Sequence, residues 1–327
     1  MKKTIMITGG TGSLGKALIK KIKKEHPDWK IVVFSRDEGK QALSFGNDPS
    51  IVRIIGDIRD LTKVDVSMRL HKPNYVIHAA ALKRVDDMEF HPDECVKTNV
   101  IGSQNVATAA LANNVEKCML VSTDKACQPV NVYGSSKFIA ERVFSNFDYN
   151  SDSTIFASVR YGNVIASRGS FIPNWIEKIK NGEEITITDP ECTRFLFTLE
   201  NAVDTVMTSM FSAIGGEVFV PGLDSYTIPD VICALELITG VCNVETRIIG
   251  LRPGEKLHED MMSETEMDRV VSVQPTENYP LYAILPQFTR KEGYSTEKYE
   301  GDRLNSGFCL DSTLENLVDK IRAGVVQ

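Results

Sequence analysis

The sequence predicts an α/β fold, in which a doubly wound parallel sheet is followed by a smaller C-terminal domain. Two observations support this fold class. Short apolar runs alternate with segments of helical periodicity through the first half of the chain, as in strand–helix–strand units, whose parallel strands lie between two layers of helices. A glycine-rich turn also follows the first apolar run and opens the first helical segment, which is typical of Rossmann-type sheets.

Each element of the first domain follows from its own residues. Apolar runs predict strands, and apolar residues recurring every three or four positions predict helices. In chain order, strands are expected at residues 4–7, 31–34, 52–55, 75–78, 118–121 and 155–159. Helices are expected between them at residues 16–23, 61–70, 93–113 and 133–147. We assign residues 1–162 to this Rossmann-type domain, whose ligand cleft should lie at the carboxyl ends of the strands.

After residue 162 the pattern loosens, and glycines and prolines separate shorter elements. A short strand is expected at residues 185–187, and a strand at 217–220 is expected to return to the main sheet. Helices are expected at residues 173–180, 228–239 and 312–323. We interpret residues 163–327 mainly as a smaller substrate-binding domain.

Composition narrows the class of protein. The 327 residues carry a net charge of -7, which argues against a nucleic-acid surface, because phosphate binding needs clustered lysine and arginine. Apolar runs are shorter than a membrane span, and no signal-like segment follows the first residues. The seven cysteines are scattered, without metal-ligand spacing. We therefore expect a cytoplasmic protein with reduced thiols and no metal.

The segment after the first predicted strand indicates a dinucleotide cofactor. Gly9, Gly12 and Gly15 have the spacing GxxGxxG. Glycine permits the tight turn and lets the backbone approach a pyrophosphate. The helix that follows offers unpaired N–H groups and partial positive charge at its N-terminus.

Residues at the ends of the next strands narrow the choice of cofactor. NAD enzymes often carry an acidic residue after the second strand, whereas Arg36 at that place suits the 2′-phosphate of NADP, with Lys40 as a second contact. Asp57, after the third strand, is predicted to bind the adenine, with a helix cap or turn as the alternative. Small residues after the fourth strand would let a flat cofactor lie over the sheet edge: Ala79, Ala80 and Ala81.

A Thr, Tyr and Lys set follows the fifth predicted strand. Tyr133 and Lys137 are four positions apart at the start of a helix, so they project from one face. A tyrosine pKa of about 10 makes a poor base, and a neighbouring ammonium lowers that pKa. Lys137 can also hold the nicotinamide ribose, and Thr123 can hydrogen-bond a substrate hydroxyl. The set predicts oxidation of an alcohol.

Asp124 and Lys125 add chemistry that a simple dehydrogenase does not need. They stand beside Thr123 at the predicted cleft, where an acid and a base could move a second pair of protons. The alternative is an ion pair at the surface of the loop.

The order and spacing of these motifs resemble those of the inverting UDP-N-acetylglucosamine 4,6-dehydratases, extended short-chain dehydrogenases/reductases that start pseudaminic acid biosynthesis in bacteria. The resemblance is carried first by residues 122–126, 129–131, 133–134 and 137. It continues in residues 7–13, 35–38, 56–60, 97–99, 160–164, 167–170, 188–190, 193–195 and 252–257. Residues 86–88 depart from the family, which often has a proline there.

This resemblance implies a three-step cycle in one site. NADP oxidises the C4 hydroxyl of the sugar, with Tyr133 as base. Lys125 then removes the C5 proton, and Asp124 is the acid for the C6 hydroxyl, which leaves as water. Hydride returns to C6, and protonation of C5 from the opposite face gives a β-L-arabino 4-keto-6-deoxy sugar. The cofactor is regenerated, so the cycle has no net oxidation.

The resemblance also implies the substrate and cofactor contacts. Arg194 and Arg252 are expected to bind the pyrophosphate of the UDP-sugar, since arginine recognises phosphate in a bidentate manner; the alternative for either is a salt bridge between domains. Further substrate contacts are Lys83, Thr123, Asn163, Arg168 and Glu255, although Glu255 could instead pair with Lys256. The remaining cofactor contacts are Thr11, Ser13, Leu14, Ser35, Ile58, Asn99, Ser122, Tyr161, Asn163 and Val164. Relatives form dimers and hexamers, so a homo-oligomer is expected.

Two alternatives stay open. A UDP-sugar 4-epimerase shares Thr123, Tyr133 and Lys137 but needs no Asp–Lys pair, and its product keeps the C6 hydroxyl. A non-catalytic NADP(H)-sensing protein commonly lacks the Tyr or the Lys, and both are present here.

Overall fold

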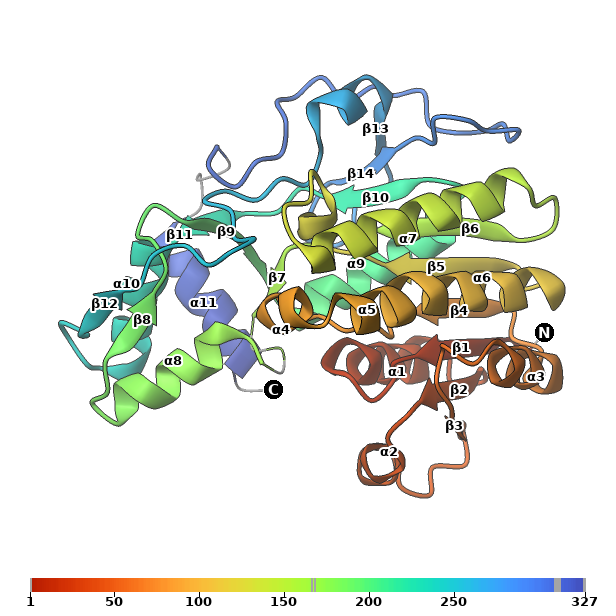
Figure 1. Ribbon diagram of the computed structural model, residues 1–327, viewed down its shortest axis with the longest axis horizontal. Coiled ribbons are helices and arrows are strands. Elements are labelled where there is room, and N and C mark those ends of the chain that lie inside the picture. Colours follow the sequence, from red (N-terminus) through yellow and green to blue (C-terminus); the bar gives the residue numbers. More distant parts are fainter. Residues whose placement is uncertain (1, 166, 168, 309–312, 326–327) are drawn as a thin grey trace.

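The computed structural model describes residues 2–165, 167, 169–308 and 313–325. Its centre is a nine-stranded sheet with helices on both faces (Figure 1). Six parallel strands stand in the order β3-β2-β1-β4-β5-β6, so the predicted doubly wound sheet is confirmed. Their bounds are β1 (Thr4–Thr8), β2 (Lys30–Ser35), β3 (Ile51–Ile55), β4 (Tyr75–His78), β5 (Lys117–Val121) and β6 (Ile155–Val159).

Three strands from the second half of the chain extend the sheet beyond β6. β10 (Val218–Pro221) pairs in parallel with β6, so the predicted return strand is confirmed. Two strands that we did not predict, β14 (Leu281–Ile284) and β13 (Val270–Val273), follow in antiparallel pairing. The segment that we assigned mainly to substrate binding therefore also builds one edge of the main sheet.

One face of the sheet is covered by three helices with a shared apolar core. The helices are α3 (Leu61–His71), α6 (Gly102–Ala112) and α7 (Val132–Tyr149). Val64, Val106 and Phe144 from these helices are fully buried against the sheet. α7 is the helix that carries Tyr133 and Lys137, so this core fixes its orientation over β5 and β6.

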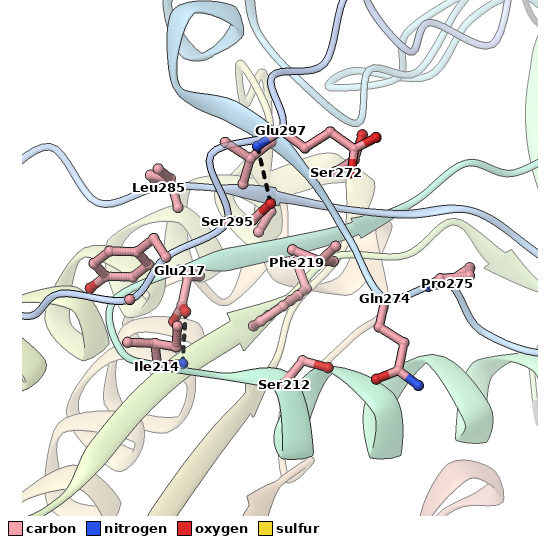
Figure 2. A pocket seen from close by; sticks show the side chains of 15 residues that line it. Ser212, Ile214, Glu217, Phe219, Ser272, Gln274, Pro275, Leu285, Ser295 and Glu297 are labelled. Carbon is pink, nitrogen blue, oxygen red and sulfur yellow. Dashed lines mark hydrogen bonds between the residues drawn. The ribbon is translucent and has the colours of Figure 1, made fainter.

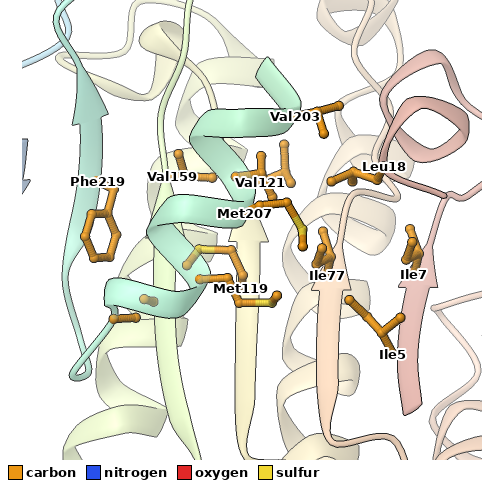
Figure 3. Packing of buried hydrophobic residues seen from close by; sticks show 14 of the residues in the cluster. Ile5, Ile7, Leu18, Ile77, Met119, Val121, Val159, Val203, Met207 and Phe219 are labelled. Carbon is orange, nitrogen blue, oxygen red and sulfur yellow. The ribbon is translucent and has the colours of Figure 1, made fainter. Parts of the chain in front are cut away.

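The other face is covered by α1 (Ser13–Glu25) and α9 (Leu199–Ser212), which lie side by side (Figure 1). Leu18 of α1 packs with Val203 and Met207 of α9 over the central strands (Figure 3). α9 was not predicted, and it comes from beyond residue 162. The main sheet is therefore closed by a helix from the second half of the chain.

A second lobe lies beside the carboxyl ends of the strands (Figure 1). Its own core includes Trp175, Leu235 and Ile321. Its helices are α8 (Phe171–Lys180), α10 (Ile228–Thr239) and α11 (Leu314–Val325). Its strands form two small sheets: β7 (Asn163–Val164), β9 (Thr193–Phe197) and β11 (Ser225–Thr227) in one, and β8 (Ile185–Ile187) and β12 (Thr246–Ile248) in the other.

The structure differs from the prediction in several short elements. The single helix expected at residues 93–113 is divided, because α5 (Pro92–Cys95) leads into a π-helical segment, Val96–Ile101, before α6. Apolar periodicity does not reveal such a widened turn. The helices α2 (Glu38–Phe45) and α4 (Val85–Phe90) were also missed. The helix expected at residues 312–323 is α11, and residue 312 lies outside the described residues. Within the described ranges, no helix is long and apolar enough to cross a bilayer.

Candidate functional site

The predicted cofactor loop follows β1, and two of its positions have room only for glycine. Gly9 has a φ of +70°, and a Cβ there would lie 2.8 Å from the Ala80 nitrogen. A Cβ on Gly15 would lie 2.5 Å from the Cα of Gly10. Gly12 is the N-cap of α1 and has no side chain to cover the helix end. The first N–H groups of α1 can therefore bind an anion.

The end of β2 presents one exposed cation beside the acid after β3. The Arg36 guanidinium is half-exposed, 3.9 Å from the Asp57 carboxylate. That carboxylate also accepts hydrogen bonds from Arg59 at 2.7 and 2.9 Å. Lys40 instead pairs with Asp37 at 2.8 Å. Arg36 is thus better placed than Lys40 for a 2′-phosphate.

Asn99 connects the loop after β4 to α7. Its fully buried amide accepts a hydrogen bond from the Leu82 nitrogen at 2.8 Å and donates one to the Leu82 oxygen at 2.9 Å. The same amide donates to Ser136 Oγ on α7 at 3.0 Å. Both the oxygen and the nitrogen of this amide are hydrogen-bonded within the protein, so Asn99 positions the loop at Leu82, directly after Ala79–Ala81.

The other predicted cofactor residues lie along the same edge. Most are wholly or partly buried, and their side chains already make contacts within the protein. Ser35 accepts a hydrogen bond from Gln41, and Ser122 donates one to Glu141. Ile58 packs on Gly102, and Leu14 and Val164 pack against the apolar core. Thr11 is buried, Ser13 begins α1, and Tyr161 packs beside Phe197. Their roles toward a cofactor stay predictions.

A close backbone contact brings Tyr133 to the turn after β5. This turn, the 3₁₀ segment Asp124–Ala126, is capped by the Thr123 side chain. Asn131 caps the N-terminus of α7, and its Oδ1 accepts a hydrogen bond from the Gly134 nitrogen at 2.6 Å. A Cβ on Gly134 would lie only 2.2 Å from the Lys125 oxygen. Glycine after the tyrosine therefore lets the helix start directly against the Asp124–Ala126 turn.

Burial changes the proton affinities of the Tyr and Lys in this set. Burial raises the pKa of Tyr133 to about 12, although the Lys125 ammonium and a hydrogen bond with Thr123 act to lower it. Burial also lowers the pKa of Lys137 to about 8. The cation that opposes the rise at Tyr133 is thus Lys125, a role that we predicted for Lys137. Tyr133 is a neutral phenol in this state.

Asp124 and Lys125 face the inside of the site. Asp124 is 1% exposed and accepts hydrogen bonds from Thr123 Oγ1 at 2.8 Å and from Lys125 Nζ at 3.0 Å. The Lys125 ammonium also contacts Asn163 Oδ1 at 3.4 Å. The alternative of a surface ion pair therefore does not describe this pair. The arrangement places an acid and a base beside Thr123, the residue predicted to bind the substrate hydroxyl.

Sequence reasoning missed a second carboxylate beside Lys125. Glu259 Oε1 lies 3.3 Å from the Lys125 ammonium, and Glu259 is 3% exposed. It follows the 252–257 segment by two positions, and no spacing or periodicity marks it. Only the fold brings these two residues together.

A buried ion cluster under the site was also not predicted. Arg160, at the end of β6, is fully buried between Glu141 of α7 and Glu266 of the 3₁₀ segment Glu264–Arg269. It donates hydrogen bonds to both carboxylates at 2.8 to 3.0 Å. A buried arginine needs such pairing. The cluster ties α7 to the C-terminal segment.

The two predicted phosphate-binding arginines differ in exposure. Arg194 is 7% exposed and donates to the Leu257 oxygen at 3.0 Å and to Glu255 at 2.8 Å. Arg252 is exposed, with its nearest carboxylate, that of Asp86, at 3.5 Å. Arg252 can reach a ligand directly, whereas Arg194 braces the loop around Glu255.

The remaining predicted substrate residues are placed only in part. Lys83 is exposed on the loop after β4. Arg168 lies outside the described residues. Lys256, considered as a partner of Glu255, instead donates to the Cys127 oxygen at 2.9 Å.

The described part of the chain contains no group of three or more metal-ligating side chains. Its six cysteines are unpaired. Cys127 is buried near Glu266, and burial raises the pKa of its thiol to about 12, so this thiol packs rather than reacts.

A cavity of about 510 Å³ lies away from these residues, around the amino end of β10 (Figure 2). Phe219, Val271 and Leu285 are part of its lining, together with Glu217. The Glu217 carboxylate accepts a hydrogen bond from the Ile214 nitrogen at 2.7 Å. This acid therefore builds the turn before β10, at the opposite end of the sheet from the predicted site.

Comparison with known proteins adds a family and several relatives. The family model described as polysaccharide biosynthesis protein matches residues 5–279. The chain is 41% identical over 321 residues to a UDP-N-acetylglucosamine 4,6-dehydratase (inverting) of Campylobacter jejuni, covering 95% of this chain and 92% of the relative. It is also 40% identical over 311 residues to a UDP-glucose 4-epimerase of Rickettsia rickettsii, covering 92% and 88%. The solved structure of Pen from Bacillus thuringiensis is similar, with a TM-score of 0.88, 32% identity and 98% of both chains covered.

Proposed function

Because this chain belongs to the polysaccharide biosynthesis protein family, we propose that it is a nucleotide-sugar dehydratase, specifically a UDP-N-acetylglucosamine 4,6-dehydratase that inverts C5. The observation that carries the proposal is the buried pair of Asp124 and Lys125 beside Thr123 and Tyr133. Alcohol oxidation needs no such pair, whereas elimination of water needs an acid and a base at the same sugar ring. The name of the C. jejuni relative agrees with this chemistry.

A nicotinamide dinucleotide fits the loop after β1. Gly12 leaves the N-terminus of α1 uncovered for a pyrophosphate, and Gly9 brings the loop backbone against Ala80. NADP is the proposed form, because the exposed Arg36 guanidinium can pair with a 2′-phosphate. When bound, the cofactor supplies the hydride acceptor for C4 and the hydride donor for C6.

The protein's own residues account for the proton transfers. Tyr133 acts in this step as the phenolate, its own proton having been lost to solvent, and it takes the proton of the C4 hydroxyl as the C4–H bond breaks, while Thr123 hydrogen-bonds the same oxygen. The resulting ketone acidifies C5, so Lys125 can take the C5 proton. The ammonium formed at Lys125 passes a proton to Asp124, which gives it to the C6 hydroxyl, and this hydroxyl leaves as water when the C6–O bond breaks. Hydride at C6 and a proton at C5 complete a product lighter by one water.

The Rickettsia relative favours a second candidate, a UDP-sugar 4-epimerase. Such an enzyme would use Thr123 and Tyr133 to oxidise and reduce C4 without breaking the C6–O bond. The buried Asp124–Lys125 pair would then have no proton to transfer, so we favour the dehydratase.

The deciding experiment is incubation of the purified protein with UDP-N-acetylglucosamine in deuterated water, followed by mass spectrometry and NMR. The dehydratase is expected to give a 4-keto product that has lost water and carries deuterium at C5. A product of unchanged mass with inverted C4, from this substrate or from UDP-glucose, would establish the epimerase instead. Unchanged substrate would refute the dehydratase assignment for this sugar.

We also propose that the protein works in the cytoplasm as a dimer or hexamer. An apolar patch on α7 and the π-helical segment supports self-association, since its side chains are 36 to 45% exposed: Val96, Ile101, Phe138 and Ile139. Light scattering on the purified protein should give a mass at least twice that of one chain. Cell fractionation tests the compartment.

A further inference from the structure

Lys125 is held at the meeting point of three segments that are distant in sequence. Its ammonium has three N–H donors, and the structure offers three acceptors: Asp124 at 3.0 Å, Glu259 at 3.3 Å and Asn163 at 3.4 Å. The resemblance and the motifs account for Asp124 and Asn163. Glu259 is the acceptor that neither explains.

The backbone of Glu259 is fixed rather than mobile. Its nitrogen donates to Ser306 Oγ at 2.8 Å, and its oxygen accepts from the Ser306 nitrogen at 2.9 Å. Ser306 in turn hydrogen-bonds Thr193 Oγ1 of β9 at 2.6 Å. The carboxylate is therefore delivered to Lys125 by a braced segment, as a positioning role requires.

The carboxylates around Lys125 are only half satisfied. Asp124 Oδ2 and Glu259 Oε2 are both buried, and the described residues give neither a hydrogen-bond partner. A buried carboxylate oxygen without a partner is costly. Such atoms cluster at sites where a proton or a ligand group is exchanged. Here both lie in carboxylates that contact the same ammonium.

The charges that face Lys125 explain why a second carboxylate matters. Burial lowers the pKa of Lys125, but Asp124 and Glu259 raise it above its ordinary value, with Arg194 opposing them. The phenol of Tyr133 lies near the same ammonium. A lysine held as ammonium cannot take a carbon-bound proton until it has given one away. The nearest acceptors for that proton are the two carboxylates.

We infer that Glu259 is the positioning residue of Lys125: it holds the amine toward the sugar and accepts one of its protons, so that neutral Lys125 can take the C5 proton. This inference rests on the function proposed above. One proton moves from Lys125 Nζ to the Glu259 carboxylate, so the pair changes from ammonium and carboxylate to amine and carboxylic acid without net gain or loss. After Lys125 has taken the C5 proton, its ammonium passes one proton to the Asp124 carboxylate at 3.0 Å, and Asp124 then protonates the C6 hydroxyl.

The test compares Glu259→Gln and Glu259→Asp with the wild type and with Glu264→Gln. Glu264 undergoes the same chemical change in the same stretch of chain, but its side chain is 81% exposed. Glu259→Gln is expected to lower kcat by roughly 100-fold with little change in KM, because Glu259 does not touch the substrate. Glu259→Asp should restore part of the rate, and Glu264→Gln should behave as wild type.

Two further readouts separate positioning from folding. Without Glu259, the limb of the pH–rate profile that reports the base should move to lower pH. The reason is that Glu259 no longer raises the pKa of Lys125, whereas Asp124 still raises it, Arg194 still lowers it and Tyr133 still lies beside it. Reduced cofactor should also accumulate in a single turnover, because C4 oxidation proceeds while removal of the C5 proton is slow. Wild-type kcat and an unshifted profile in Glu259→Gln would overturn the inference.

A loss of kcat in both Glu259 variants, without a shifted profile or reduced cofactor, would also overturn it in favour of a structural role. These results are distinct from failure of the proposed function. In that case the wild-type protein itself would form no 4-keto product, and no comparison among variants would be needed to see it.

Discussion

The cofactor loop and the acid–base cluster lie at the same edge of the sheet, but they are built in different ways. The loop is one contiguous segment whose shape is set by backbone packing at Gly9 and Gly15. The cluster gathers Lys125, Glu259 and Asn163 from three segments through side-chain contacts. Spacing alone can reveal the first arrangement, whereas the second depends on the tertiary fold. The dinucleotide-binding loop, which many oxidoreductases share, is therefore formed by one short segment, whereas the residues around Lys125 that serve the proposed elimination are brought together by the tertiary fold.

The largest effect is expected from a change at Lys125, which should impair the acid–base cluster and leave the cofactor loop intact. Lys125→Ala removes the proposed C5 base and should reduce dehydration by about 1,000-fold or more. Cofactor affinity should stay within about twofold, because Lys125 lies outside the glycine loop. Product formation followed by mass spectrometry and cofactor titration by fluorescence measure the two effects separately.

The exposed Lys97, which pairs with Asp93 on the surface, provides the control for this change. Lys97→Ala should match the wild type in both assays. If Lys125→Ala instead lost cofactor binding, the two regions would be one structural unit, and the role of Lys125 as a base would be refuted.

The next prediction tests whether the C-terminal segment supports the cluster. Burial acts to raise the pKa of Glu266, but Arg160 and Ser263 outweigh it and lower this pKa from its ordinary value of 4.5 to about 2. This carboxylate therefore contributes stability above about pH 4.5, and the contribution disappears as the pH falls through about 2. Glu266→Gln should lower the free energy of unfolding by about 3 kcal/mol near neutrality.

Urea unfolding at several pH values checks this prediction. The difference in unfolding free energy between the wild type and Glu266→Gln should shrink steadily below about pH 4.5. Glu264→Gln, whose side chain is exposed beside Arg303, should change stability by less than about 0.5 kcal/mol. A difference that stays constant with pH would mean that the pKa of Glu266 is the same in the folded and unfolded protein, and the predicted effect of Arg160 on it would be refuted.

The same contrast explains what the sequence could predict. Six parallel strands, the return strand and the glycine loop follow from local apolar runs and spacing. α9, β13 and β14 were missed although they complete the main sheet, because their place depends on pairing with distant segments. In the site, Thr123, Asp124, Lys125 and Tyr133 were found from one short motif. Glu259 and Arg160 were not, since nothing local distinguishes a buried acid or cation from an exposed one.

A smaller effect is expected when the loop is changed without touching the cluster. Gly9→Ala adds a Cβ 2.8 Å from the Ala80 nitrogen at a φ of +70°. The resulting strain and backbone shift should weaken dinucleotide binding by about 10- to 100-fold. Gly182 has the same φ of +70° with open space around it, so Gly182→Ala separates backbone strain from close packing. If the two variants had equal cofactor affinity, the close contact between Gly9 and Ala80 would not be needed for dinucleotide binding.

The smallest predicted effect concerns which cation at the end of β2 binds the 2′-phosphate of the cofactor. Arg36 is half-exposed and only loosely paired, whereas Lys40 is engaged by Asp37 at 2.8 Å. Arg36→Ala should therefore weaken NADP binding by about tenfold, the value of one charged hydrogen bond, and leave NAD binding nearly unchanged.

Lys40→Ala should cost about twofold or less, because surface pairs contribute little. Parallel titrations with NADPH and NADH decide between these expectations. If Arg36→Ala lost affinity equally for both dinucleotides, Arg36 would support the loop without recognising a phosphate. In that case neither Arg36 nor Lys40 would explain a preference for NADP. The glycine loop would still bind the pyrophosphate that is common to both cofactors.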